Sequence, residues 1–145
     1  MRGIIVVSHN QMAAGLISTC DMIVGHHHHC QYLGLNEDGV NVFSEELYKN
    51  LDDMLEKYDE VIALADIKGG TPFNQLLRYK LEKNIERMYI ISGVNIPLLI
   101  QLMVNIDNDQ ETRLIVEEAI SVGQESILLE TLEEKQDNEF DDILD

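Results

Sequence analysis

Residues 3–10, which read Gly-Ile-Ile-Val-Val-Ser-His-Asn, decide the fold class of this chain. The unbroken apolar run in this stretch is typical of a strand that is buried on both faces, as the strands of parallel sheets are. A second such run, Val-Ile-Ala-Leu-Ala at residues 61–65, comes directly before Asp66. We therefore predict two buried strands, the first ending at His9 and the second leading into Asp66.

The segments around these two runs alternate between helical and extended patterns. Apolar residues that include Ile23 recur at spacings of three and four before Gly25, which predicts a helix that stops at this glycine. Thr71 followed by Pro72 predicts the start of another helix, whose buried face includes Leu81. The other expected elements are a strand at 32–35, a helix capped by Ser44, a strand at 88–91, a short helix capped near Asn95, a helix at 110–122 closed by Gly123, and a strand at 127–129.

Strands that alternate with helices in this way predict an α/β fold with an open, doubly wound and mostly parallel sheet. We expect the strand order 2-1-3-4, with residues 127–129 as a fifth strand at the edge. In such sheets ligands bind beyond the carboxyl ends of the strands, where the strand order reverses. The first and third strands flank that point, so His9 and Asp66 are expected to project into one crevice.

Length and charge exclude several classes of protein. The 145 residues suit one domain, with 27 acidic and 10 basic residues giving a net charge of −17. Nucleic acid is therefore an improbable partner, because its phosphates are held by clustered Lys and Arg. The apolar runs are too short to cross a bilayer and no signal pattern is present, so we expect a cytoplasmic protein without membrane insertion. We expect a domain at 1–130 and an acidic C-terminal tail at 131–145.

His9 and its predicted neighbours have the chemistry of a phosphoryl acceptor. A histidine is partly unprotonated near neutral pH, and a carboxylate such as Asp66 can orient it by accepting the N–H of one ring nitrogen. Gly69, Gly70 and Thr71 offer backbone N–H groups and a helix amino end, which together suit a phosphate. Each feature alone also fits a structural role, and from the residues alone both interpretations stay open.

Three stretches together resemble the IIA component of mannose-class sugar phosphotransferase systems. They are residues 5–9 (Ile-Val-Val-Ser-His), 66–74 (Asp-Ile-Lys-Gly-Gly-Thr-Pro-Phe-Asn) and 92–97 (Ser-Gly-Val-Asn-Ile-Pro). The resemblance covers roughly the first 130 residues of the chain. It implies that His9 is phosphorylated by the phosphocarrier protein HPr and passes the group to a IIB component, that Asp66 hydrogen-bonds His9, and that Gly70 and Thr71 lie beside the phosphate.

The resemblance also bears on assembly and cofactors. Members of the family are homodimers that exchange their last strand, which would be residues 127–129 here. No metal or organic cofactor is expected. Some members continue into a IIB domain, whereas this sequence reads as an acidic tail, so we expect IIB to be a separate polypeptide.

Other interpretations stay open. The run His26-His27-His28-His29 departs from the family pattern, and it is either a solvent-facing loop or a metal site with Cys30. The phosphocarrier subunit of dihydroxyacetone kinase shares the fold and the histidine of the first strand. A non-catalytic module that binds an anion or a metal is a further alternative. A receiver domain fits less well, because no acidic pair follows the first strand.

Overall fold

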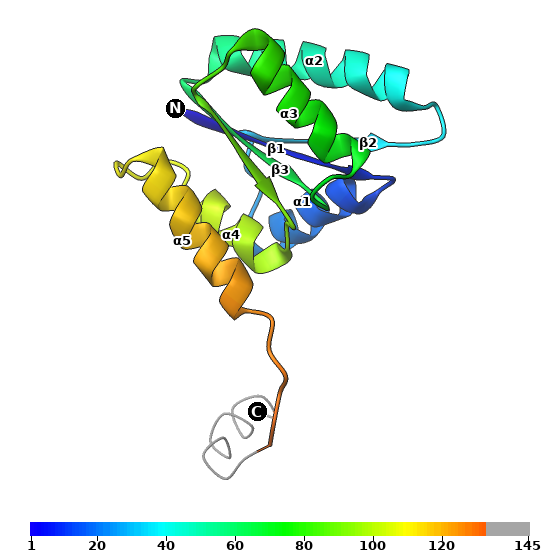
Figure 1. Ribbon diagram of the computed structural model, residues 1–145. Coiled ribbons are helices and arrows are strands. Elements are labelled where there is room, and N and C mark those ends of the chain that lie inside the picture. The colour runs from blue at the N-terminus through cyan, green and yellow to red at the C-terminus, as the bar shows by residue number, and fades with distance from the viewer. Residues whose placement is uncertain (133–145) are drawn as a thin grey trace.

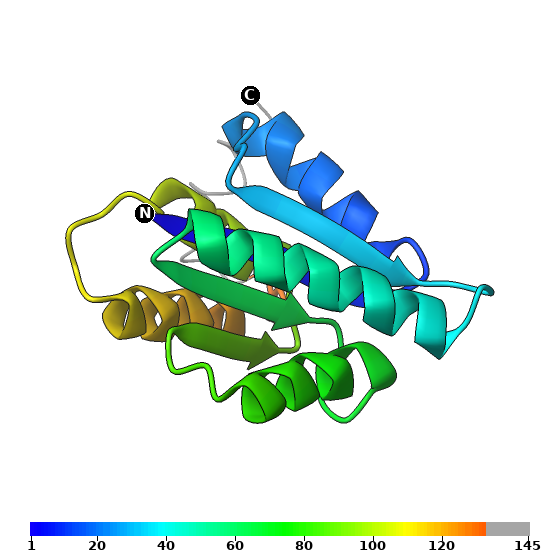
Figure 2. The same ribbon diagram turned by 90° about the horizontal axis from the view of Figure 1, so that it is seen from above.

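The computed structural model describes residues 1–132, and its centre is a parallel sheet built from the predicted apolar runs. The four strands follow the predicted order β2-β1-β3-β4, and each adjacent pair is parallel. Figure 2 shows the strands side by side. Their bounds are β1 Arg2–His9, β2 Cys30–Leu35, β3 Glu60–Ala65 and β4 Met88–Ser92.

Helices cover both faces of this sheet, as a doubly wound fold requires (Figure 1). They are α1 Met12–Val24, α2 Val40–Lys57, α3 Thr71–Lys83, α4 Ile96–Val104 and α5 Thr112–Glu125. Ile4 and Val6 of β1 pack toward α1, α4 and α5, whereas Ile5 and Val7 pack toward α2 and α3. Successive side chains of a strand point to opposite faces, so an unbroken apolar run is what a sheet covered on both sides needs.

Several helix ends differ from the sequence-based expectation. Ser44 lies inside α2 instead of capping it, because Gly39 with φ +96° turns the chain into the helix earlier. Gly70 is the N-cap of α3, which makes Thr71 its first helical residue. Helix α5 continues past Gly123, whose missing side chain allows close packing against Leu98.

Other local predictions have mixed outcomes. Gly25 ends α1 and Asn95 caps α4 through its side chain, so both of these predictions are confirmed. Ile23 is 58% exposed and Leu81 is 70% exposed, so the assignment of both to buried faces is wrong. These two residues lie at the margins of the apolar stripes, where spacing alone does not determine exposure.

The segment that follows α5 is not part of the sheet. Residues 127–132 have no regular secondary structure in this single chain, so the predicted strand at 127–129 is absent from it. Only residues 131 and 132 of the predicted acidic tail fall within the part of the chain that the structure describes, and the division into 1–130 and 131–145 stays a prediction. Across residues 1–132, none of the helices is both long and apolar enough to span a bilayer.

Candidate functional site

The carboxyl ends of β1 and β3 bring the two predicted titratable residues together. Val7 of β1 lies opposite Ala65 of β3, so the residues that follow them leave the sheet at the same edge. His9 is the last residue of β1, and Asp66 comes directly after β3. The strand order predicted from the sequence therefore places both side chains at one edge of the sheet, where the family of doubly wound folds binds ligands.

One carboxylate oxygen of Asp66 holds His9 in two ways. Asp66 Oδ2 accepts the backbone N–H of His9 at 2.9 Å and lies 2.7 Å from His9 Nδ1. The other oxygen, Oδ1, accepts the backbone N–H of Ile67 at 2.8 Å. The Asp66 side chain is 10% exposed and that of His9 is 49% exposed. The imidazole is therefore half open to solvent, while the carboxylate that holds it is largely buried.

These contacts affect the pKa of Asp66 and the tautomer of His9. Desolvation by burial works to raise the pKa of Asp66, but the hydrogen bonds from His9 and Ile67 outweigh it, and the net result is a lowered pKa. The carboxylate is therefore ionised near neutral pH and has no proton to donate. The shared hydrogen then sits on Nδ1 of His9, which leaves the lone pair on Nε2 when the ring is neutral.

A glycine-rich turn lies against the same imidazole. A Cβ atom at Gly70 would be 3.0 Å from Cε1 of His9, so a side chain there would crowd the ring and glycine leaves it room. Gly69 has φ +81°, a left-handed conformation that favours glycine. The side chain of Asn74 donates to the Gly69 carbonyl at 3.1 Å and ties the turn to α3.

The turn differs in detail from the predicted phosphate cradle. The N–H of Gly70 donates to the Ile67 carbonyl at 3.3 Å, so it closes the turn instead of pointing outward. Within residues 1–132 the N–H and the hydroxyl of Thr71 donate no hydrogen bond to protein. Thr71 is the first residue of α3, where backbone N–H groups and the helix dipole favour an anion. Lys68 is exposed in the same loop.

Comparisons with known proteins agree with this fold and place the chain in a family. Residues 3–120 match the family model EIIA-man, described as the fructose IIA component of the phosphotransferase system (PTS). The chain belongs to this family. A solved PTS IIA protein associated with the fucose utilization operon of Streptococcus pneumoniae is 36% identical, with a TM-score of 0.76 over 88% of this chain and 92% of that one.

Two curated relatives from the same system are also similar to this IIA-family chain. The mannose-specific EIIAB component of Escherichia coli K12 is 30% identical over 127 residues, which are 86% of this chain but 38% of that protein. The chain therefore spans less than half of that relative. The fructose-specific EIIA component of Bacillus subtilis is 29% identical over 71% of this chain and 69% of its own length.

The histidine run of this IIA-family chain lies away from His9, between α1 and the amino end of β2. His26 Nδ1 is 3.2 Å from Asp21 Oδ2, and the ring of His29 packs against Tyr58. Within the described part of the chain no three potential ligands lie close enough to hold a metal ion. Burial raises the pKa of the Cys30 thiol to about 12, and nearby Asp21 adds to the effect, so this thiol is protonated.

Sequence reasoning did not identify one residue that shapes the site. Ser8 is fully buried, and its hydroxyl accepts the backbone N–H of Ala13 at 2.7 Å while donating to the carbonyl of His9 at 3.0 Å. Ser8 therefore joins the end of β1 to the first turn of α1. A serine at a strand end that precedes a helix is a recognisable capping signal, and it could have been used.

Proposed function

We propose that this chain is a IIA phosphocarrier: His9 accepts a phosphoryl group from phosphorylated HPr and passes it to a separate IIB component during sugar uptake. The observation that carries the proposal is the 2.7 Å contact between His9 Nδ1 and the Asp66 carboxylate, which leaves Nε2 as the nucleophilic nitrogen. Membership of the family supports the choice of both partners, and the position of His9 beside Asp66 supports its choice as the phosphorylated residue. We further propose that the protein works in the cytoplasm.

The transfer step uses only the imidazole and its anchor. The lone pair of Nε2 forms a bond to phosphorus, while the bond from phosphorus to the donor's histidine breaks and its electron pair returns to the donor's ring. The His9 ring gains cationic character, which the adjacent Asp66 carboxylate stabilises. Donor and product are both phosphohistidines, so the step is nearly balanced in free energy, and the protein contributes positioning and electrostatics.

The amino end of α3, which follows the glycine turn, would hold the phosphoryl group once it is bound to His9. The N–H and hydroxyl of Thr71 make no hydrogen bond to the described protein, and both sit at the amino end of α3. Such an end stabilises an anion by about 0.3–1 kcal/mol when exposed. Gly69 and Gly70 keep the approach free of side chains. No metal or organic cofactor enters this mechanism.

The test is phosphoryl transfer to the full chain. Purified protein is incubated with phosphorylated HPr, and intact-mass spectrometry followed by site mapping is expected to show one acid-labile phosphoryl group on His9. A chain that binds phosphorylated HPr or an anion but gains no covalent phosphate would instead be a binding module, and the proposal would fail.

The acceptor distinguishes the nearest alternative. The phosphorylated chain is offered a mannose-class IIB component or, separately, the nucleotide-bearing subunit of dihydroxyacetone kinase. Transfer to IIB is the expected result. Transfer to the kinase subunit alone would assign the chain to that system.

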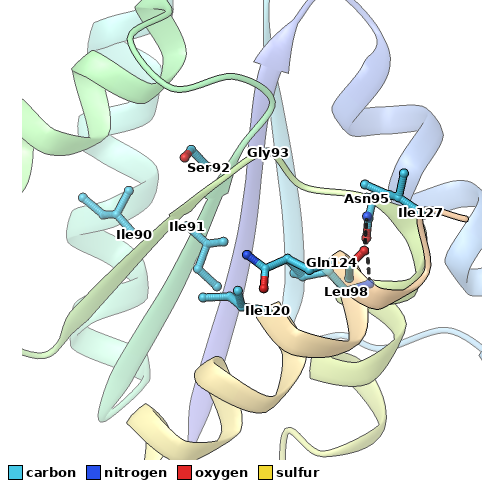
Figure 3. Close-up of a pocket in the computed structure, with 10 residues that line it drawn as sticks. Ile90, Ile91, Ser92, Gly93, Asn95, Leu98, Ile120, Gln124 and Ile127 are labelled. Atoms are coloured by element: carbon cyan, nitrogen blue, oxygen red, sulfur yellow. Dashed lines mark hydrogen bonds between the residues drawn. The ribbon is translucent and has the colours of Figure 1, made fainter.

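We also propose that the chain forms a homodimer by exchanging residues 127–129. Strand β4 is an edge strand, and beside it lies a groove of about 310 Å³ between β4, α4 and α5 (Figure 3). Ile90, Ile91 and Ile120 line its apolar part. Ile127, Leu128 and Leu129 are 79%, 69% and 90% exposed in the single chain. An exposed apolar segment together with an open sheet edge suits pairing with a second copy.

A further inference from the structure

The turn that follows His9 has an uncommon backbone conformation. Asn10 has φ +49°, which places it in the left-handed region that few residues other than glycine and asparagine adopt readily. Its backbone N–H donates to the carbonyl of Leu35 on β2 at 2.7 Å. The chain therefore leaves β1 by folding back over the end of the neighbouring strand.

Gly34 leaves the space that this turn occupies. A Cβ atom at Gly34 would lie 2.0 Å from the carbonyl oxygen of Asn10 and 3.2 Å from its carbonyl carbon. The obstructing atoms are backbone, so no side-chain rotation relieves the clash. Gly34 is paired with Ser8 in the sheet, and the contact therefore lies beside the residues that carry the imidazole.

The turn cannot move freely in response to a larger residue. On its other side, Ser8 is buried and binds both the His9 carbonyl and the N–H of Ala13 in α1. The Asn10 carbonyl belongs to the peptide unit that joins Asn10 to Gln11, so moving it rotates the backbone of Asn10, which directly follows His9. The contacts of His9 with Asp66 through its own N–H and through Nδ1, at 2.9 and 2.7 Å, depend on that backbone.

We infer that Gly34 is a positioning residue for the His9 imidazole: its missing side chain allows the left-handed Asn10 turn that holds Nδ1 against Asp66. The inference rests on the proposed function only for its effect on transfer. The effect on the His9–Asp66 contact is independent of that function.

The test compares Gly34→Ala with Gly15→Ala in the full chain. Gly15 lies in α1, and a Cβ added there meets no atom within 4 Å, so it is the matched control. Nitrogen-15 NMR reports the tautomer of His9 and its Nδ1 proton. Gly34→Ala is expected to lose the single Nδ1–H tautomer and to accept phosphoryl groups about 10- to 100-fold more slowly, as a displacement of about 1 Å implies. Gly15→Ala is expected to match wild type in both measurements.

A second substitution keeps the test decisive if Gly34→Ala does not fold. Asn10→Val disfavours the left-handed conformation without changing β2, and it is expected to show the same loss of the tautomer. A folded variant of either kind with wild-type NMR signals and a wild-type rate would overturn the inference. If wild type itself takes no phosphoryl group, the proposed function fails, while the NMR comparison still tests the role of Gly34.

Discussion

The carboxyl edge of the sheet and its lateral edge at β4 differ in whether a single chain provides all of the contacts around them. At the carboxyl edge, β1 and β3 bring His9 and Asp66 within 2.7 Å, and the glycine turn before α3 completes the surroundings. At the lateral edge, β4 has no further strand within residues 1–132, and the apolar residues 127–129, which follow α5, are exposed. The chemical site is built within one chain, whereas the lateral edge is left incomplete.

Because of this difference, phosphoryl transfer and self-association are expected to depend on different residues. Changes at His9 or Asp66 are expected to alter transfer with little effect on association, and changes at residues 127–129 are expected to do the reverse. Because neither His9 nor Asp66 lines the groove beside β4, the two properties should be separable by single substitutions.

The largest expected effect is that of His9→Gln, which removes the acceptor nitrogen and should abolish phosphorylation. The His9 ring is half exposed, and Asp66 keeps the backbone N–H groups of residues 9 and 67 as partners, so the free energy of unfolding should change little. Phosphoryl incorporation and urea unfolding measure the two effects. His28→Gln, at an exposed position of the histidine run, is the matched control and should behave as wild type. Phosphorylation of His9→Gln would contradict the assignment.

Asp66→Asn should slow transfer by about a hundredfold. The amide can still contact the ring, but it cannot stabilise the developing positive charge or enforce the Nδ1–H tautomer. Rapid-quench measurement of phosphoryl transfer from HPr checks the expectation. A rate equal to that of wild type would show that the carboxylate has no orienting role.

Leu129→Glu should weaken self-association by at least about tenfold, because a carboxylate would replace an apolar side chain at the proposed dimer contact. Phosphorylation of His9 by HPr should persist. Sedimentation velocity over a concentration series measures association. Leu81→Glu, at an exposed position of α3, is the control, and equal association of both variants would place the dimer contact elsewhere.

The smallest expected effect concerns pH. The pKa of Asp66 is lowered in the folded state, so its stabilising contribution is complete above the ordinary pKa of about 4 and is lost as the pH falls through the lowered value. Wild type should therefore exceed Asp66→Asn in stability at pH 7, and the difference should shrink toward pH 3. A difference that grows on acidification would reverse the assigned direction of the shift.

The sequence was informative where local pattern and topology agree. The apolar runs before His9 and Asp66 predict buried parallel strands, and the strand order then brings the two side chains together. The position of Ser44 inside α2 could not be predicted, because an earlier turn at Gly39 competes with the capping signal. The contact of Gly34 with Asn10 could not be predicted either, because it depends on the register of β1 against β2.

The residues near position 127 show a different limit. Their apolar pattern predicts a strand, yet a strand needs a partner edge, and the single chain leaves this segment irregular. A local pattern therefore indicates the tendency to form a strand, while strand formation also requires an available sheet edge.

The most direct test of the central claim is the position of the phosphoryl group on the ring of His9. Phosphorus–nitrogen correlation in the NMR spectrum of the freshly phosphorylated protein identifies the bonded nitrogen. Attachment to Nε2, with Nδ1 still donating to Asp66, is the expected result. Attachment to Nδ1, or to any residue other than His9, would contradict the role assigned to the His9–Asp66 pair.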